Sequence, residues 1–515
     1  MQTRVLIFGG GATGTGLLRD LALRGVDCCL VESRDLNAGT SGANHGLLHS
    51  GARYVSNDPE SARECRQEAA LLKQLAPDII EDTGGLFVAV KGDDESYIAD
   101  FPGHCEASGV PCREISPDEA REREPHLSTE TIAAYEVEDA SIDPFRLALE
   151  NVSHAREHGA KFLRRTKVVA FTRDSGRIRS ATLEDTRTGK RFEAEAEIFV
   201  NATGAWAGQV AGLAGLDVPL LYSKGTLVVS HNRVSHRVIN RLRPPSDSDI
   251  LVPGGTVSIL GTTSIRLDSP DNILPTVREV DDIIEQESRM VPKLERTRYI
   301  RAYAGVRPLV QPRGKDGGDR EVSRGFSLMD HAEDGLDNFL TITGGKLTTF
   351  RLMAEKTADS VCAKLGVNAP CRTREEPYPC CETWRWTEPG GLALEEITSV
   401  DPKDVVLCEC EMIPKKAVDA ILDDMAEDPR VGLKAISRRS RLGKGSCQGS
   451  FCALRTTAHL YDRGVLRERQ GVENIRDFLA ERWRGQRPIL WDMPLVQNEL
   501  QEALYCGLLN LDLED

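Results

Sequence analysis

The chain has 515 residues, which is long enough for several domains and a sizeable core and excludes a small domain standing alone. Its 65 basic and 80 acidic residues give a net charge of −15, which argues against nucleic acid as the main partner. No run of about 18 or more apolar residues occurs, and the N-terminus enters a strand-like segment at once, so we expect a cytoplasmic chain whose 14 cysteines are reduced.

The first segments in chain order predict a dinucleotide-binding unit. Residues 5–8 are an apolar run suited to a buried strand, and residues 16–24 have the apolar spacing of a helix. Between them lies GGGATG at residues 9–14. A second apolar run, residues 28–31, ends at Glu32, whose carboxylate can accept a hydrogen bond from a ribose hydroxyl. This order of elements is typical of NAD sites and FAD sites alike.

Each glycine of this turn has an expected role. Gly9 permits the tight turn, Gly11 lets the backbone approach a pyrophosphate, and Gly14 lets the helix pack close to the strand. The positive end of the helix dipole would then face the phosphates. We therefore expect Gly9, Gly11, Gly14 and Glu32 to bind the cofactor.

Two histidines, His45 and His49, lie four residues apart, which is the spacing of a metal pair on a helix. Glycines at positions 42, 46 and 51 make a helix doubtful here, and no clear third ligand accompanies the pair. We therefore favour His49 as a single group. It could transfer a proton, contact the cofactor or fill a polar pocket.

Two later segments repeat the pattern of a strand followed by glycines. Residues 198–208 read IFVNATGAWAG, and residues 339–355 read FLTITGGKLTTFRLMAE. Three such junctions in one chain favour a single extended cofactor, and therefore FAD over NAD. The cofactor contacts expected at the two later junctions are Ala202, Gly204, Gly344, Gly345 and Thr348.

The pattern of the chain divides it into four segments. Residues 1–370 alternate strand-like and helix-like runs, which predicts an α/β fold with a Rossmann-like FAD-binding domain and an inserted mixed-sheet substrate domain. Residues 371–400 are dense in Pro, Gly and charge and are expected to be a linker. Residues 401–460 are expected to be a small helical metal-binding domain, and residues 461–515 a C-terminal helical extension.

Four C-terminal cysteines form two close pairs in the sequence. Cys408 and Cys410 are two positions apart, Cys447 and Cys452 are five apart, and 36 residues separate the pairs. Two pairs of thiols are typical of a metal centre. Zinc knuckles normally use C-x2-C, whereas C-x-C followed by a second pair resembles the bacterioferritin-associated ferredoxin type of [2Fe-2S] domain. The spacing favours the cluster over zinc and leaves both open.

Three motifs resemble those of the FAD-dependent glycerol-3-phosphate dehydrogenases. They are GTSGANHGLLHSGARYV at residues 39–55, AGVRPLV at residues 304–310 and GGKLTTFRLMAE at residues 344–355. Together with the C-terminal cysteines, NHGLLHSGARY resembles the A-type subunit of the anaerobic members. The resemblance covers nearly the whole chain and implies a D-amino-acid-oxidase-like fold that binds FAD.

The same resemblance implies an activity and partners. It implies oxidation of sn-glycerol 3-phosphate to dihydroxyacetone phosphate, with electrons passing to quinone. It also implies two partners in one complex, namely a second flavoprotein subunit, and with it an iron-sulfur subunit that docks the complex on the cytoplasmic face of the inner membrane. We therefore expect a peripheral membrane complex of glycerol catabolism.

Site residues are implied in the same way. The positions that match substrate-holding residues are Arg53, Tyr54, Arg307 and Lys346. The expected catalytic set is His49, Arg307 and Lys346, and the further flavin contacts are Thr40 and Ser41. An arginine grips phosphate with two parallel donors, whereas a lysine acts as a point charge near phosphate or flavin. Each of these cations could instead be an ordinary solvated or ion-paired group.

Two other functions stay open. The first is a glycerol-3-phosphate oxidase or another amine or hydroxy-acid flavin oxidoreductase, which the C-terminal cysteines disfavour. The second is a non-enzymatic redox sensor or iron-sulfur module with a vestigial flavin fold. The presence of the glycine turn, Arg307 and Lys346 disfavours that second function.

Overall fold

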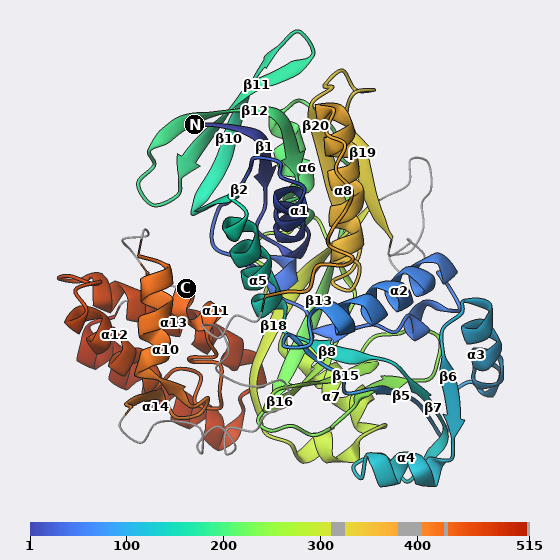
Figure 1. The fold of residues 1–515 in the computed structure, drawn as a ribbon. Helices are drawn as coiled ribbons and strands as arrows, with labels where there is room; N and C mark the ends of the chain where they lie inside the picture. The colour runs from blue at the N-terminus through green and yellow to red at the C-terminus, as the bar shows by residue number, and fades with distance from the viewer. Residues whose placement is uncertain (311–324, 380–403, 427–430, 512–515) are drawn as a thin grey trace.

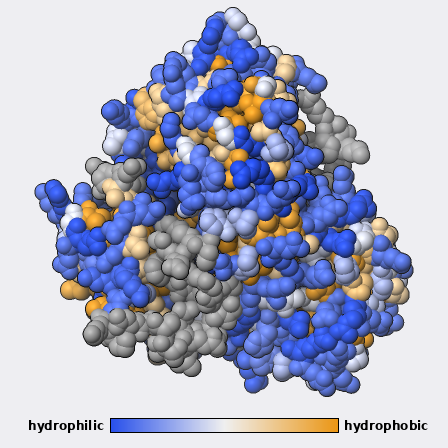
Figure 2. Space-filling view, viewed as in Figure 1, coloured by the Kyte–Doolittle hydropathy of each residue, from blue (hydrophilic) through white to orange (hydrophobic). Residues whose placement is uncertain are grey.

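The computed structural model describes residues 1–310, 325–379, 404–426 and 431–511. Figure 1 shows a first sheet with its helices at the top, a second sheet below it and the C-terminal helices at the side. Figure 2 shows the same face as mostly hydrophilic, with smaller apolar patches. No helix in the described ranges is long and apolar enough to cross a membrane.

The first sheet has a parallel centre with antiparallel additions. Its strands are β1 (Gln2–Phe8), β2 (Cys28–Glu32), β9 (Lys161–Arg164), β10 (Thr166–Asp174), β11 (Arg177–Asp185), β12 (Arg191–Asn201), β19 (Phe326–Asp330) and β20 (Phe339–Gly344). Strands β9, β2, β1, β12 and β20 pair in parallel, in that order. Antiparallel β11 and β10 extend the sheet from β12, and β19 pairs with β20.

Helices α1 (Ala12–Leu23), α5 (Pro144–Glu157) and α8 (Phe350–Leu365) cover one face of this sheet. Their apolar residues form one core with strands β1, β2, β12 and β20. Leu17, Leu18 and Leu21 of α1 are fully buried in it. A second core, with α6 (Ala207–Leu213) nearby, lies on the other face. The parallel strands are therefore buried on both sides, which explains their continuous apolar runs.

The second sheet is mixed. Its strands are β5 (Gly85–Val90), β6 (Cys112–Ile115), β7 (Thr131–Val137), β13 (Leu220–Ser230), β14 (Val238–Arg241), β15 (Ile250–Gly254), β16 (Val257–Gly261), β17 (Ile265–Leu267) and β18 (Tyr299–Val310). Strands β14 and β5 are parallel and the other recorded pairs are antiparallel. Val280 and Ile283 of α7 (Val277–Ser288) pack on one face.

Smaller elements complete the fold. The helices are α2 (Pro59–Leu75), α3 (Glu95–Ala107) and α4 (Pro117–Arg123). A small sheet combines β3 (Leu47–Leu48), β8 (Ala140–Ile142) and β4 (Ile80–Glu81). Short 3₁₀ turns occur at Thr40–Gly42, Ala52–Tyr54, Gly204–Trp206, Pro292–Arg296 and Arg487–Ile489. The α/β fold with an inserted mixed sheet, predicted from the sequence, is confirmed.

The C-terminal part is a helical bundle with one short hairpin. Its elements are β21 (Val406–Cys408), β22 (Ile413–Pro414), α10 (Lys415–Asp424), α11 (Leu433–Arg439), α12 (Cys452–Asp462), α13 (Gln470–Gln486) and α14 (Asp492–Leu509). One apolar core runs from Leu407 to Leu511 and so joins residues on both sides of position 460. The predicted domain boundaries stay predictions, because residues 380–403, which include most of the linker expected at 371–400, lie outside the described residues.

Candidate active site

Backbone contacts shape the glycine turn between β1 and α1 and leave no room for side chains. Gly9 has a φ of +110°, and a Cβ there would lie 2.6 Å from the carbonyl oxygen of Ala202. A Cβ on Gly14 would lie 1.9 Å from the carbonyl oxygen of Gly9. A Cβ on Gly11 would lie 2.9 Å from Ser41 Oγ. Gly9 and Gly14 therefore have the steric roles expected of them, and Gly11 keeps the N-terminus of α1 accessible.

Glu32 ends β2 directly beside this turn and is buried. Its Oε2 accepts a hydrogen bond from the Gly10 N–H at 2.7 Å, and its Oε1 accepts one from the Arg34 N–H at 2.7 Å. The Ser33 hydroxyl also donates to Oε1 at 3.2 Å. The carboxylate thus fixes the turn, a role that the sequence did not predict. It keeps acceptor capacity for a further donor, because a carboxylate offers about four lone-pair positions.

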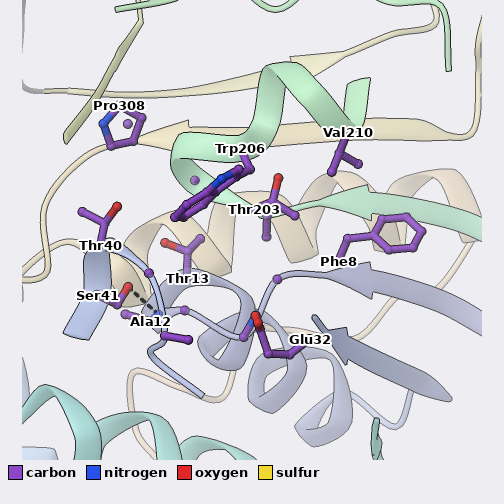
Figure 3. A pocket seen from close by; sticks show the side chains of 18 of the residues that line it. Phe8, Ala12, Thr13, Glu32, Thr40, Ser41, Thr203, Trp206, Val210 and Pro308 are labelled. Carbon is purple, nitrogen blue, oxygen red and sulfur yellow. Dashed lines mark hydrogen bonds between the residues drawn. The ribbon is translucent and has the colours of Figure 1, made fainter. Parts of the chain in front are cut away.

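A cavity of about 600 Å³ runs from the glycine turn to the junction of β20 and α8. The predicted cofactor residues on its wall are Gly9, Gly11, Glu32, Thr40, Ser41, Ala202, Gly204, Gly344 and Gly345. In Figure 3, Trp206 and Thr203 lie on one side of it, and Ala12 lies near Glu32 on the other. The dashed line marks the Ala12 N–H donating to Ser41 Oγ at 3.0 Å. Its wall includes residues of all three strand-to-glycine junctions, at 9–14, 202–206 and 344–347. The cavity therefore suits an extended ligand.

Two predicted cofactor residues do not line this cavity. Gly14 packs against the turn from behind, and Thr348 is buried with its hydroxyl accepting the His49 N–H at 3.0 Å. Sequence reasoning missed other wall residues, among them Trp206 and residues 166–168. The aromatic ring within ATGAWAG was a usable signal for Trp206, whereas nothing local marks the start of β10.

A smaller cavity of about 190 Å³ adjoins the first. The residues common to both walls are Thr40, Asn44, Tyr54 and Arg307. The smaller cavity is also lined by His49 and Arg53, while Lys346 lines the larger one. The structure therefore brings together, around one junction, all five residues predicted to bind substrate or act in catalysis.

The two arginines of this junction are held by fixed partners. Arg307 on β18 donates from Nη1 to the carbonyl oxygen of Thr263 at 3.0 Å. A Cβ on Gly225 would lie 2.5 Å from Arg307 Nη2, so this glycine gives the guanidinium its space. Arg53 Nη2 lies 2.8 Å from Oδ2 of the fully buried Asp249. Both guanidiniums are thus oriented before any ligand arrives, which reduces the entropy lost on binding.

His49 follows β3 and is buried, with its Nε2 3.4 Å from the Tyr54 hydroxyl. Burial, together with the nearby positive charges of Arg53 and Lys346, holds the pKa of His49 well below its usual range. Burial is also the largest cause that lowers the pKa of His45, to about 3. Both imidazoles are therefore neutral near pH 7, and each has a nitrogen that can accept a proton.

Lys346 also lies beside Tyr54. Its Nζ donates to Ser61 Oγ at 2.8 Å and lies 4.8 Å from the centre of the Tyr54 ring. The ammonium is therefore placed by α2 and by an aromatic face, and its charge adds to that of the two arginines. The result is a cationic pocket with a neutral histidine in its wall.

The four C-terminal cysteines form two pairs in space. Cys408 is hydrogen-bonded to Cys452, and Cys410 to Cys447. The hydrogen bond from Cys447 lowers the pKa of Cys410 to about 6 and raises that of Cys447 itself. In the parts of the chain that the structure describes, no group of three or more His, Cys, Asp or Glu side chains is arranged to hold a metal ion. The metal centre expected from the spacing stays a prediction.

Cations before the second cysteine pair hold the C-terminal helices against the first sheet. Nη1 and Nη2 of Arg439 lie 3.1 and 3.2 Å from the Asp35 carboxylate. Burial alone would raise the pKa of Asp35, but Arg439 and Arg164 overcome this effect and hold the pKa well below its usual range. Arg441 pairs with Glu411 in the same region. These cations are therefore ion-paired.

A model of the family described as FAD dependent oxidoreductase (DAO) matches residues 4–360. The chain belongs to this family. Members of this family are described as FAD-dependent oxidoreductases, so the chain is a FAD-dependent oxidoreductase. The sequence prediction of FAD over NAD is confirmed.

Relatives of known identity extend over the whole chain. The chain is 40% identical to the A-type subunit of the anaerobic glycerol-3-phosphate dehydrogenase of Escherichia coli (strain K12), over 99% of this chain and 97% of that protein. It is 39% identical to the A1-type subunit of the anaerobic glycerol-3-phosphate dehydrogenase of Haloferax volcanii, over 99% and 91%. The predicted resemblance to this type of subunit is therefore confirmed at the level of sequence similarity.

Solved structures share the fold. The glycerol-3-phosphate dehydrogenase from Bacillus halodurans, complexed with FAD, superposes with a TM-score of 0.65 at 20% identity, covering 95% of this chain and 96% of that one. Glycine oxidase from Geobacillus kaustophilus superposes with a TM-score of 0.58 at 20% identity, covering 74% and 99%. These two structures share one fold although their names differ in substrate. The fold alone therefore does not identify the substrate of this chain.

FAD fits the residues present. Side chains are excluded at Gly9 and Gly14, so the turn and α1 lie closer together than any other residue would allow. The large cavity then continues to the cationic junction at Tyr54 and Arg307. When bound, FAD supplies the hydride acceptor. The protein supplies the binding wall and the charges around the smaller cavity.

Proposed function

We propose that this chain oxidises sn-glycerol 3-phosphate to dihydroxyacetone phosphate. The observation that carries the proposal is the small cationic cavity beside the FAD cavity, with Arg53 and Arg307 in its wall and Lys346 close by. A phosphate dianion is small enough for about 190 Å³ and matches these charges. The relatives named as glycerol-3-phosphate dehydrogenases support the same substrate.

Arg307 holds the substrate phosphate in this proposal. Its guanidinium is planar and is already oriented by Thr262 and Thr263, which take one N–H of each Nη atom. The remaining N–H groups can still offer two parallel donors to phosphate oxygens. Arg53 adds charge while remaining bound to Asp249. Lys346 and Tyr54 complete the wall on the FAD side.

His49 takes the proton from the substrate hydroxyl. Without substrate, the charges of Arg53 and Lys346 contribute to the low pKa of His49. A bound dianion offsets part of that positive field and raises the proton affinity of the imidazole at the moment when a base is needed. Tyr54, 3.4 Å from Nε2, keeps the ring oriented.

Arg307→Lys tests this arrangement. Lysine keeps the charge but loses the second parallel donor, which is worth about 1.5 kcal/mol or more for a bond to a charged group. The Michaelis constant for glycerol 3-phosphate should rise about tenfold or more while the FAD content is unchanged. Arg278→Lys, on the exposed face of α7, is the matched control. An unchanged constant in a folded, FAD-loaded Arg307→Lys enzyme would remove Arg307 from the phosphate site.

Cys408, Cys410, Cys447 and Cys452 hold a [2Fe-2S] cluster in the same proposal. Support comes from the two thiol pairs and from backbone N–H groups directed at the sulfurs, including that of Gly443 to Cys408. Such donors stabilise thiolate ligands and are typical of cluster sites. Zinc is the competing occupant, and metal analysis distinguishes the two.

Partner subunits receive the electrons and deliver them to quinone at the cytoplasmic face of the inner membrane. The docking face proposed here is a stripe on α14, with members 56–77% exposed: Met493, Val496, Leu500, Leu504 and Leu508. The 3- and 4-residue spacing places them on one side of the helix. Helix α14 carries Asp492, Glu499 and Glu502 but no Lys or Arg, which favours a protein groove over an anionic lipid surface.

A further inference from the structure

A third cavity of about 410 Å³ lies where the C-terminal helices meet both sheets. In Figure 1, α11 and α13 stand beside β18 and β16 in this region. The cavity shares Ala38, Gly39 and Asn44 with the FAD cavity, and its opposite wall includes Gln448, the residue after Cys447. It therefore lies between the FAD site and the cysteine pairs. It also shares Ala43, Asn44 and His45 with the proposed phosphate site, while Arg307 lines only the latter of these two.

The wall of this cavity is strongly cationic. Seven Lys and Arg side chains line it against four carboxylates, an excess of three positive charges in a chain whose net charge is −15. Two of the cations, Arg301 and Lys434, share one carboxylate, Glu481, at 3.5 and 3.6 Å. Three others, Arg146, Arg438 and Arg441, pair with carboxylates that do not line the cavity, namely Glu150, Asp35 and Glu411. The positive charge left uncompensated is therefore mainly that of Arg482 and Lys444, and it attracts an anion.

Two buried arginines line this space, one on α5 and one on α13. Arg146 on α5 is 8% exposed and Arg482 on α13 is 7% exposed. Nε and Nη2 of Arg146 and Nε of Arg482 have no hydrogen-bond partner among the described residues. Glu150 Oε1, which also has no hydrogen-bond partner among the described residues, is 3.6 Å from Arg146 Nε. Arg482 Nη2 donates to Ser437 at 2.9 Å. A buried donor without an acceptor is costly, and a bound oxyanion would satisfy it.

Lys444 adds a third cation to the cavity. Its Nζ lies 4.2 Å from the centre of the Phe145 ring. Burial lowers the pKa of Lys444 to about 7, with Arg441 and Arg482 adding to the effect against the opposing pull of Asp143. An anion in the cavity would restore its charge. The three cations belong to α5, to α13 and to the loop before the second cysteine pair.

Part of the wall is apolar. Val257 and Ile259 of β16 line it, together with Phe145 and Phe478, whose rings lie against Lys444 and Arg482. A volume of about 410 Å³ falls within the range of small-molecule sites and exceeds what one phosphate group fills. The occupant should therefore combine an anionic group with an apolar or aromatic body.

We propose that this cavity binds a second phosphate-bearing small molecule, with its phosphate on Arg146 and Arg482 and an apolar or aromatic body against Phe145 and β16. The ligand joins the C-terminal helices to the FAD-binding domain, because its phosphate contacts both parts. It occupies the space between the two cofactor regions of the chain. Binding therefore stabilises the docked arrangement of the C-terminal helices.

Phenyl phosphate and inorganic phosphate are suitable probes for the FAD-loaded full chain. Phenyl phosphate should raise the melting temperature by about 2 °C or more at saturation, and inorganic phosphate should bind more weakly because it leaves the apolar wall uncovered. Arg482→Gln and Arg146→Gln should each weaken phenyl phosphate binding about tenfold or more in calorimetric titration. Arg278→Gln, on the exposed face of α7, should bind as the unmodified chain does.

The Arg307→Gln variant separates this site from the proposed substrate site. Phenyl phosphate binding that survives Arg307→Gln and is lost in Arg482→Gln supports the inference, whatever the substrate proves to be. Binding lost in Arg307→Gln and retained in both Arg482→Gln and Arg146→Gln would overturn it. If either glutamine variant fails to retain FAD, Arg482→Lys, which keeps the charge but not Nε, should still bind measurably more weakly than the unmodified chain.

Discussion

The glycine turn offers the sharpest test of how FAD is bound, through Gly14→Ala. A Cβ at this position would lie 1.9 Å from the carbonyl oxygen of Gly9, and that oxygen would have to retreat by about 1.5 Å to reach the 3.4 Å at which ordinary contact begins. Overpacking of this kind costs about 1–3 kcal/mol. The moved carbonyl belongs to the turn that faces the pyrophosphate. We therefore expect FAD affinity to fall about tenfold or more.

Gly103→Ala is the matched control for Gly14→Ala. Both glycines lie within helices, but a Cβ on Gly103 of α3 meets nothing within 4 Å. The control should gain about 0.5–1 kcal/mol from helix propensity and keep its FAD. The assay is the FAD to protein ratio after purification, followed by titration of FAD into the apoprotein. Full FAD occupancy and normal affinity in Gly14→Ala would show that the close packing of turn and helix is not needed for binding.

Three further changes test other parts of the molecule. Cys447→Ser should lower iron and labile sulfide while glycerol 3-phosphate still reduces FAD; zinc without iron in anaerobically prepared protein would refute the cluster. Burial raises the pKa of Glu150 to about 7, so its contribution to stability is present below the usual carboxyl pKa and lost as pH rises through about 7. Glu150→Gln should therefore flatten the fall in melting temperature between about pH 5 and pH 8, and an unchanged profile would contradict this. Leu500→Glu should release the chain from its co-expressed partner subunits, whereas Leu213→Glu on α6 should not. If both variants stay bound to the partner subunits equally well, α14 is not the docking face.

The first βαβ unit could be predicted from the sequence because its signals are local. The strand before Gly9, the helix after it and Glu32 all fall within one short stretch, and each element forms as expected. The hydrogen bonds that the N–H groups of Gly10 and Arg34 donate to Glu32 could not be predicted. A sequence pattern gives the position of a carboxylate but not its partners. The helix expected from residue 16 begins earlier, at Ala12, because Gly11 is its N-cap.

The sequence pattern could not predict contacts between segments that are far apart in the chain. Arg53 was expected to hold substrate, and its ion pair with Asp249 depends on the second sheet bringing residues 196 positions apart together. The same holds for Arg439 and Asp35, which join the C-terminal helices to the first sheet across 404 positions. Charge runs in a sequence identify such residues only as cations. Their partners follow from the tertiary fold.

Anaerobic mixing of the FAD-loaded chain with sn-glycerol 3-phosphate tests the central claim most directly. We predict loss of the visible flavin absorbance with glycerol 3-phosphate and far slower loss with glycerol, which lacks the phosphate that Arg307 would hold. The same structure carries a fold shared with glycine oxidase, so glycine serves as the competing substrate. Reduction of the flavin by glycine, and none by glycerol 3-phosphate, would contradict the proposed oxidation of glycerol 3-phosphate.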